Sequence, residues 1–162
     1  MYSVLFVCTG NICRSPTAHG VFEKYVQEAG LQDKIRVDSA AVSSYHVGQS
    51  PDERAIQTAL KHDVALYHLR ARQITTEDFD NFDLIVAMDS THYRRLNALC
   101  PKTDKAPVIA RMTDWALQYG TPDIPDPYYG GTDGFETVFE MIETACQNLL
   151  EDIRQELEKN NG

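Results

Sequence analysis

The chain of 162 residues is 43% hydrophobic and 24% charged, an ordinary globular composition and a normal length for one domain over residues 1–162. Its formal net charge of -9 argues against binding to nucleic acid or to anionic membranes, because both require a basic face. No stretch resembles a signal peptide or approaches the roughly 18 apolar residues of a membrane span. The four cysteines are too irregularly spaced for a disulfide framework or a zinc site, so we expect a reducing cytoplasm.

Patterns typical of strands and helices alternate along the chain. Residues 3–7 form an apolar run suited to a buried parallel strand. Ser15 and Pro16 then predict the cap and first turn of a helix over residues 16–29. The elements expected next are a strand over 35–40, a helix over 52–62, a short capped helical segment over 76–79, a strand over 84–88, a helix over 91–99 and a strand around 107–110.

A long helix is expected at the end of the chain. Asp133 and Glu136 have the spacing of a capping box, and the helix behind them is expected to continue to about Lys159. Its predicted apolar face consists of Phe135, Val138, Phe139, Ile142, Ala145, Leu149, Leu150 and Ile153. The alternation of strands and helices predicts an α/β fold, with a parallel sheet and helices on both of its faces.

The segment after the first strand has the composition of a phosphate-binding loop. Ligands of such sheets bind outside the carboxyl ends of the strands, where this segment is expected to lie. Gly10 and Asn11 accept a positive φ, which lets several backbone N–H groups turn inward around an anion. Arg14 can hold two phosphate oxygens, and the helix that follows adds its positive end.

The same surroundings would stabilise a thiolate at Cys8 and make it a nucleophile. The hydroxyl of Ser15 could donate to that thiolate and help it leave in a later step. The alternative is a buried, inert Cys8 beside a surface Arg14, but the strand before this loop and the capped helix after it favour the functional interpretation.

Asp126 is the candidate general acid. A thiolate that attacks an aryl phosphate expels a phenolate, which needs a proton from a positioned group. Pro125 and Pro127 stiffen the backbone on both sides of Asp126, although an ordinary Asp-Pro turn is the alternative. Asp123 is a neighbouring carboxylate that could be mistaken for this acid.

Tyr128 and Tyr129 follow the candidate acid directly and could wall a slot for a flat ring. Both could instead be partly buried surface aromatics. Asp89 ends the clearest strand and could face the site, but we favour its interpretation as a helix cap with Ser90 and Thr91.

Residues 8–15 and 126–129 resemble the signature segments of the low-molecular-weight protein tyrosine phosphatases. Residues 38–41, 72–74 and 88–89 extend the resemblance over nearly the whole chain. The resemblance implies a four-stranded parallel twisted sheet flanked by helices on both faces, a flavodoxin-like three-layer sandwich.

The resemblance also implies roles for individual residues. Cys8 is the nucleophile, Arg14 binds the phosphate and Asp126 is the general acid and base. The phosphate loop is completed by Thr9, Gly10, Asn11, Ile12, Cys13 and Ser15. The substrate slot is expected to be walled by Tyr45, Tyr128 and Tyr129, and the last two also resemble phosphorylation sites.

Two further expectations rest on the resemblance. Asn11, Ser39 and His68 match a hydrogen-bond network that holds the phosphate loop in shape. Cys13 matches a second thiol that can close a disulfide with Cys8 and protect it from irreversible oxidation.

The expected reaction is hydrolysis of phosphotyrosine and small aryl phosphates through a cysteinyl-phosphate, without metal or cofactor. The expected partners are phosphotyrosine-containing proteins, with inorganic phosphate or vanadate as competitive ligands. An arginine phosphatase of the same family is an alternative, although such enzymes carry a threonine where this chain has Ile12. A thioredoxin-coupled arsenate reductase would need a nearby pair of downstream cysteines, whereas Cys100 and Cys146 are isolated. A non-catalytic phosphate-binding module is the remaining alternative.

Overall fold

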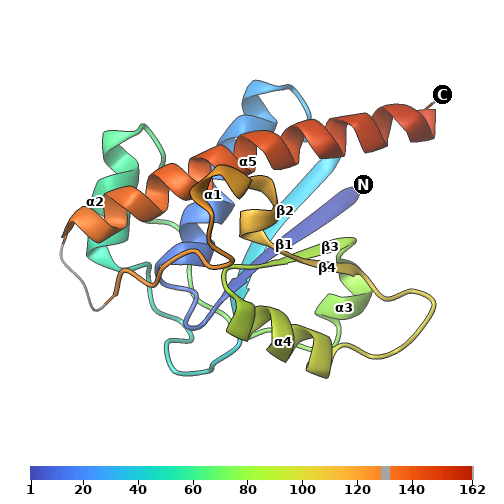
Figure 1. The fold of residues 1–162 in the computed structure, drawn as a ribbon, viewed down its shortest axis with the longest axis horizontal. Coiled ribbons are helices and arrows are strands. Elements are labelled where there is room, and N and C mark those ends of the chain that lie inside the picture. The colour runs from blue at the N-terminus through green and yellow to red at the C-terminus, as the bar shows by residue number, and fades with distance from the viewer. Residues whose placement is uncertain (129–131, 162) are drawn as a thin grey trace.

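A computed structural model describes residues 1–128 and 132–161 of the chain and contains one parallel sheet (Figure 1). The strand order is β2-β1-β3-β4, and every neighbouring pair is parallel. The strands are β1 (Tyr2–Cys8), β2 (Ile35–Ala41), β3 (Leu84–Ala87) and β4 (Val108–Arg111). The predicted parallel α/β sheet with four strands is therefore confirmed.

Helices cover both faces of this sheet (Figure 1). The α-helices are α1 (Arg14–Glu28), α2 (Glu53–Lys61), α3 (Asp78–Asn81), α4 (Ser90–Leu99) and α5 (Thr132–Asn161), and the short 3-10 helices are η1 (Met112–Trp115) and η2 (Leu117–Tyr119). None of the helices in the described part of the chain has the length and apolar character that a membrane crossing needs.

Two apolar cores form because β1 is buried on both faces. Val4 and Phe6 pack into the core beneath α1, α2 and α5, whereas Leu5 and Val7 pack into the core beneath α3 and α4. This burial explains why β1 is a continuous apolar run rather than an alternating one. The predicted apolar face of α5 is buried as expected.

The starts of two helices differ from prediction. Ser15 is not a cap, because α1 begins at Arg14 with Cys13 as its N-cap residue, and no side chain caps it. The long helix begins at Thr132, so Asp133 lies in its first turn, and Glu136 pairs with His62 instead of closing a capping box. The local sequence pattern predicted both helices, but it did not predict the residues that the Ser15 and Glu136 side chains bind.

Candidate active site

The phosphate loop connects the end of β1 at Cys8 to the start of α1 at Arg14. Asn11 adopts a left-handed conformation with φ 58°. The Cys8 and Thr9 carbonyls accept hydrogen bonds from the backbone of residues 42 and 43, and the Ile12 carbonyl accepts one from Asp52. Among the described residues, none accepts a hydrogen bond from the backbone N–H groups of residues 10–13. These donors therefore have no protein acceptor among the described residues, which is compatible with the predicted anion-binding loop.

The side chain of Asn11 holds the loop in this shape. Its Nδ2 donates to Ser15 Oγ at 2.8 Å, and its Oδ1 accepts from the backbone N–H of Arg72 at 3.1 Å. Arg72 is itself fixed by ion pairs with Asp38 and Asp78. The loop is thus tied to the segment after α2 by a contact that spans 61 positions in the sequence.

Cys8 is buried, and its Sγ lies 3.0 Å from Ser15 Oγ. Because Ser15 Oγ already accepts a hydrogen bond from Asn11, its single proton is free to point at the sulfur. The Ser15 hydroxyl is therefore placed to donate a hydrogen bond to the Cys8 sulfur.

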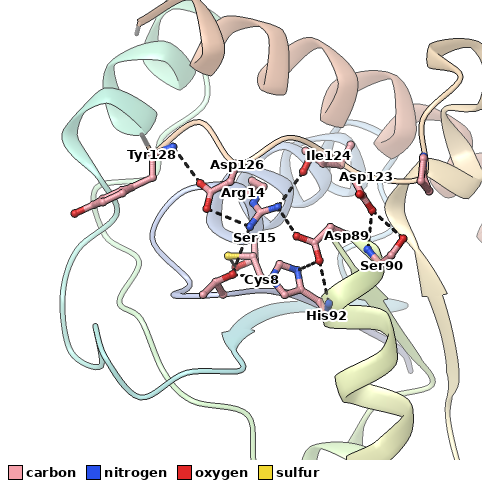
Figure 2. Close-up of polar contacts among 12 residues, drawn as sticks. Cys8, Arg14, Ser15, Asp89, Ser90, His92, Asp123, Ile124, Asp126 and Tyr128 are labelled. Atoms are coloured by element: carbon pink, nitrogen blue, oxygen red, sulfur yellow. Dashed lines mark hydrogen bonds and ion pairs between the residues drawn. The ribbon is translucent and has the colours of Figure 1, made fainter. Parts of the chain in front are cut away.

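Arg14 is 3% exposed and is held on several sides. Its Nη1 donates to Asp89 Oδ2 and to the Ile124 carbonyl, each at 2.9 Å. Its Nη2 lies 3.5 Å from Thr9 Oγ1 and 3.6 Å from Asp126 Oδ2. Figure 2 shows the guanidinium between these carboxylates and Ile124. Both Nη1 protons and one Nη2 proton are therefore directed at protein acceptors, and Nε and the second Nη2 proton remain for a phosphoryl group.

Asp89 serves both of the roles considered for it. Its Oδ1 caps α4 by accepting from the backbone N–H of His92 at 2.9 Å, and its Oδ2 binds Arg14. Partial burial opposes ionisation of Asp89, but the His92 N–H and Arg14 outweigh this effect and lower the pKa of the carboxyl. Asp89 is therefore an anion that fixes the guanidinium.

The structure separates the two candidate acids. Asp123 accepts from the backbone N–H and hydroxyl of Ser90, so it is committed to the start of α4 (Figure 2). The side chain of Asp126 is 41% exposed, lies beside Arg14 and accepts from the backbone N–H of Tyr128 at 3.0 Å. Only Asp126 of these two lines the pocket above Cys8.

These residues enclose a cavity of about 380 Å³. It is lined by Cys8, Thr9, Gly10, Ile12, Cys13, Arg14, Ser43, Tyr45, His46, Asp126 and Tyr128. Tyr45 and Tyr128 are exposed at its rim, with His46 between them at ring-centroid distances of 5.0 and 6.4 Å. Tyr129 lies outside the described residues. Sequence reasoning missed His46, whose signal was its place in the polar loop after the second strand.

The expected contact of Ser39 and His68 with Asn11 is absent among the residues described here. Ser39 Oγ instead lies 2.9 Å from Nδ1 of His19, which is buried in α1. His68 is exposed, and its ring packs edge-on against Tyr67. The supports found for Asn11 are Ser15 and Arg72, so the expectation for His68 is corrected.

His92 is a second residue that the sequence did not reveal. It is 2% exposed, and its Nε2 lies 2.7 Å from Thr9 Oγ1. Burial and the nearby Arg14 lower the pKa of His92 to about 4, so the ring is neutral at physiological pH. In the part of the chain that the structure describes, no group of three or more His, Cys, Asp or Glu side chains could hold a metal ion.

Comparisons with known proteins agree with this geometry. A low molecular weight protein-tyrosine-phosphatase of Streptomyces coelicolor is 45% identical over 159 residues, which are 97% of this chain and 96% of that protein. A protein tyrosine phosphatase from Entamoeba histolytica, solved with Hepes in the active site, has a TM-score of 0.89 and 39% identity over 96% of this chain and 98% of that one. Drosophila arginine phosphatase has a TM-score of 0.86 and 31% identity over 93% and 96% of the two chains.

The family model described as low molecular weight phosphotyrosine protein phosphatase matches residues 3–160. The match runs from β1 through the loop after it, across the segment that carries Asp126, and along α5. The resemblance first seen in residues 8–15 and 126–129 is thereby confirmed over nearly the whole chain. The chain belongs to the low molecular weight phosphotyrosine protein phosphatase family and is a phosphoric monoester hydrolase of that class.

Proposed function

We propose that this enzyme hydrolyses phosphotyrosine in proteins, and small aryl phosphates, through a cysteinyl-phosphate. The observation that carries the proposal is the convergence of Cys8, Arg14 and Asp126 on one cavity. In the first step, the Cys8 thiolate attacks phosphorus while Asp126 gives its proton to the departing tyrosine oxygen. The bond between phosphorus and that oxygen breaks, and a bond between sulfur and phosphorus forms.

The second step releases phosphate. Asp126, now ionised, takes a proton from a water molecule that attacks phosphorus, and the bond between sulfur and phosphorus breaks. The Ser15 hydroxyl supports the departing Cys8 thiolate, to which it is already close. In both steps, Arg14 and the N–H groups of residues 10–13 stabilise the charge on the equatorial oxygens.

The test compares aryl phosphates with good and poor leaving groups. Cys8→Ser should abolish turnover, because an alcohol lacks the nucleophilicity of a thiolate. Asp126→Ala should lower kcat/KM for a poor leaving group by roughly 10²- to 10⁴-fold and for a good one far less. Inorganic phosphate and vanadate should compete with substrate in the parent enzyme. An equal loss on both substrates would remove Asp126 from the role of acid.

An arginine phosphatase is the second candidate, because Drosophila arginine phosphatase is among the similar structures. Ile12 argues against arginine phosphatase activity. Its side chain is largely buried and lines the cavity, where its bulk should disfavour the planar guanidino group. Steady-state assays with phosphotyrosine and phosphoarginine peptides of matched sequence should favour phosphotyrosine, whereas a preference for phosphoarginine would reverse this assignment.

An arsenate reductase relay has no support from the positions of the other cysteines. Cys100 packs against the core beneath α3 and α4, whereas Cys146 is buried in the core beneath α1 and α5. The two thiols are thus on opposite faces of the sheet, and neither lines the cavity. Arsenate added to the same substrate panel should not be reduced.

A further inference from the structure

His92 lies directly beneath the phosphate loop, yet it lines no part of the cavity. It is the third residue of α4, and it reaches Thr9 across 83 positions of sequence. Its backbone N–H binds Asp89, and its ring binds the Thr9 hydroxyl. Asp89 and Thr9 in turn are both within hydrogen-bond distance of Arg14. Polar contacts therefore connect four residues in a closed circuit: Arg14, Asp89, His92 and Thr9.

The carboxylate beside the His92 imidazole determines which ring nitrogen carries the proton. Nδ1 is buried, has no hydrogen-bond partner among the described residues and lies 3.3 Å from Asp89 Oδ1. A lone pair on Nδ1 would face a carboxylate, whereas an N–H there is attracted to it. The proton therefore resides on Nδ1, and Nε2 accepts a hydrogen bond from the Thr9 hydroxyl.

This tautomer gives the Thr9 hydroxyl a direction. Because its proton points to His92, the lone pairs of Oγ1 are turned towards Arg14 Nη2. A protonated imidazole would reverse the arrangement by donating from Nε2. The groups that favour or oppose that protonation are Arg14 on α1, Asp89 before α4, and Asp123 and Asp126 on the segment before α5.

The hydroxyl of Thr9, in the phosphate loop, restrains the Nη2 end of the Arg14 guanidinium. Both Nη1 protons are already bound to Asp89 and the Ile124 carbonyl. The remaining freedom is a tilt of Nη2 between Thr9 at 3.5 Å and the Asp126 carboxylate at 3.6 Å. A tilt towards Asp126 would move the Nη2 donor away from the phosphoryl oxygens.

We propose that His92 is a positioning residue which, through the Thr9 hydroxyl, holds Arg14 in the orientation that stabilises the transferring phosphoryl group. The inference rests on the proposed phosphatase mechanism and extends it to a residue outside the cavity. His92 exchanges no proton with the substrate. Its effect should appear where Arg14 matters most, which is in the transition state rather than in ground-state binding.

The experiment measures kcat and KM for an aryl phosphate with His92→Asn, Thr9→Val and the double variant. Each single change should lower kcat by about 10- to 100-fold and change KM by less than about 3-fold, because a displaced catalytic group costs rate more than binding. The double variant should be no slower than the worse single variant, since both changes break the same link. Thr58→Val, at a buried threonine of α2 outside the site, is the matched control and should keep the parental kcat.

Two inhibitors separate positioning from a general structural defect. Vanadate adopts the geometry of the transition state, so its affinity should fall in parallel with kcat in His92→Asn and Thr9→Val. Inorganic phosphate should inhibit the variants almost as well as it inhibits the parent. The loss of kcat should be equal for good and poor leaving groups, which distinguishes it from a loss of the Asp126 proton.

Multiplicative losses in the double variant, or unchanged kcat in both single variants, would overturn the proposal. If His92→Asn fails to fold, Thr9→Val keeps the test intact, because it removes only the hydroxyl of a loop residue. Failure of the phosphatase mechanism itself would appear differently, as a parent enzyme without aryl phosphatase activity.

Discussion

Cys13 lies in the phosphate loop five positions after the nucleophile, and both thiols line the same cavity. Burial raises the pKa of the Cys13 thiol, and the carboxylates of Asp52 and Asp126 raise it further. Cys8 has a hydroxyl donor at 3.0 Å instead. One loop therefore holds two thiols in different surroundings, Cys8 beside a hydroxyl donor and Cys13 in a site that keeps it protonated at rest.

This difference predicts protection of Cys8 from peroxide. Peroxide converts the Cys8 thiolate to a sulfenic acid, and the Cys13 thiol then condenses with it to give a disulfide and water. A dithiol reductant returns both thiols. We expect the parent enzyme to recover most of its activity after peroxide and then reductant. Cys13→Ala should recover much less, because its sulfenic acid is oxidised further to the irreversible sulfinic acid.

The measurement is activity before peroxide, after peroxide and after reductant, with mass spectrometry of Cys8. Cys100→Ala is the matched control, since that thiol does not line the cavity and should leave recovery unchanged. Recovery of Cys13→Ala to the parental level would show that Cys13 has no protective role.

At the scale of elements, the start of α2 supports the phosphate loop. Asp52 caps this helix by accepting from the backbone N–H of Arg54 at 2.9 Å, and its own N–H binds the Ile12 carbonyl at 2.8 Å. A hydrogen bond from the Arg54 guanidinium lowers the pKa of the Asp52 carboxyl. The side chain thus stabilises the helix, whereas the backbone holds the loop.

Asp52→Ala should therefore lower stability more than activity. The loss of an N-cap costs about 1 kcal/mol of unfolding free energy, and the half-exposed ion pair adds little. Because the backbone contact with Ile12 survives, kcat should change by less than about 2-fold. Urea unfolding and steady-state kinetics check both parts, and Asp52→Asn, which keeps a capping oxygen, should lose less stability. A large fall in kcat with unchanged stability would assign the side chain to the site instead.

The local pattern of the sequence predicted most of the fold. Apolar runs and helical periodicity placed the four strands and five α-helices of the described residues to within a few positions, because both signals are contained in short stretches of chain. The two short 3-10 helices, η1 and η2, were not predicted. The residue types and neighbours of Cys8, Arg14 and Asp126 predicted one shared site, and all three side chains line one cavity; their catalytic roles stay predictions.

Contacts between distant segments were not predictable from the pattern. His92 meets Thr9 over 83 positions and Arg72 meets Asn11 over 61, and neither partner leaves a mark near the other in the sequence. Ser15 was misread as a cap because its true partners, the Cys8 sulfur and the Asn11 amide, are determined by the shape of the loop. The first two contacts depend on packing that brings separate elements together, whereas those of Ser15 depend on the conformation of the loop.

At the scale of the whole molecule, the proposed anion site lies within a strongly acidic protein. The chain has 24 acidic and 15 basic residues, so the global field opposes a phosphoryl ligand. The buried guanidinium of Arg14 and the N–H groups of residues 10–13 act at short range, where they outweigh charges that solvent screens. Asp89 binds this guanidinium and limits the positive charge, so it opposes the neutral state of His92, which burial and Arg14 favour.

The neutral His92 predicts how the stability of the whole protein depends on pH. Its pKa is lowered from 6.5 to about 4 in the folded state, so between these values the unfolded chain binds a proton that the folded chain excludes. Unfolding free energy must then rise with pH across this window and fall on acidification. The lowered carboxyl pKa values of Asp52 and Asp89 act in the same direction, but their contribution is lost at lower pH, below about 4.

The loss attributable to His92 between pH 7 and pH 4.5 should be about 2 to 3 kcal/mol. Urea unfolding at half-unit pH intervals measures it for the parent and for His92→Gln, whose amide does not titrate. The curve of the variant should be flatter than that of the parent between pH 6.5 and 4.5 and should become parallel to it about one pH unit below the folded-state pKa of about 4. The difference between the two slopes is the relevant quantity, because changes in net charge act on both proteins alike. Parallel curves throughout would mean that His92 takes up a proton equally in the folded and unfolded chains, and the imidazole would then not be held neutral beneath the phosphate loop.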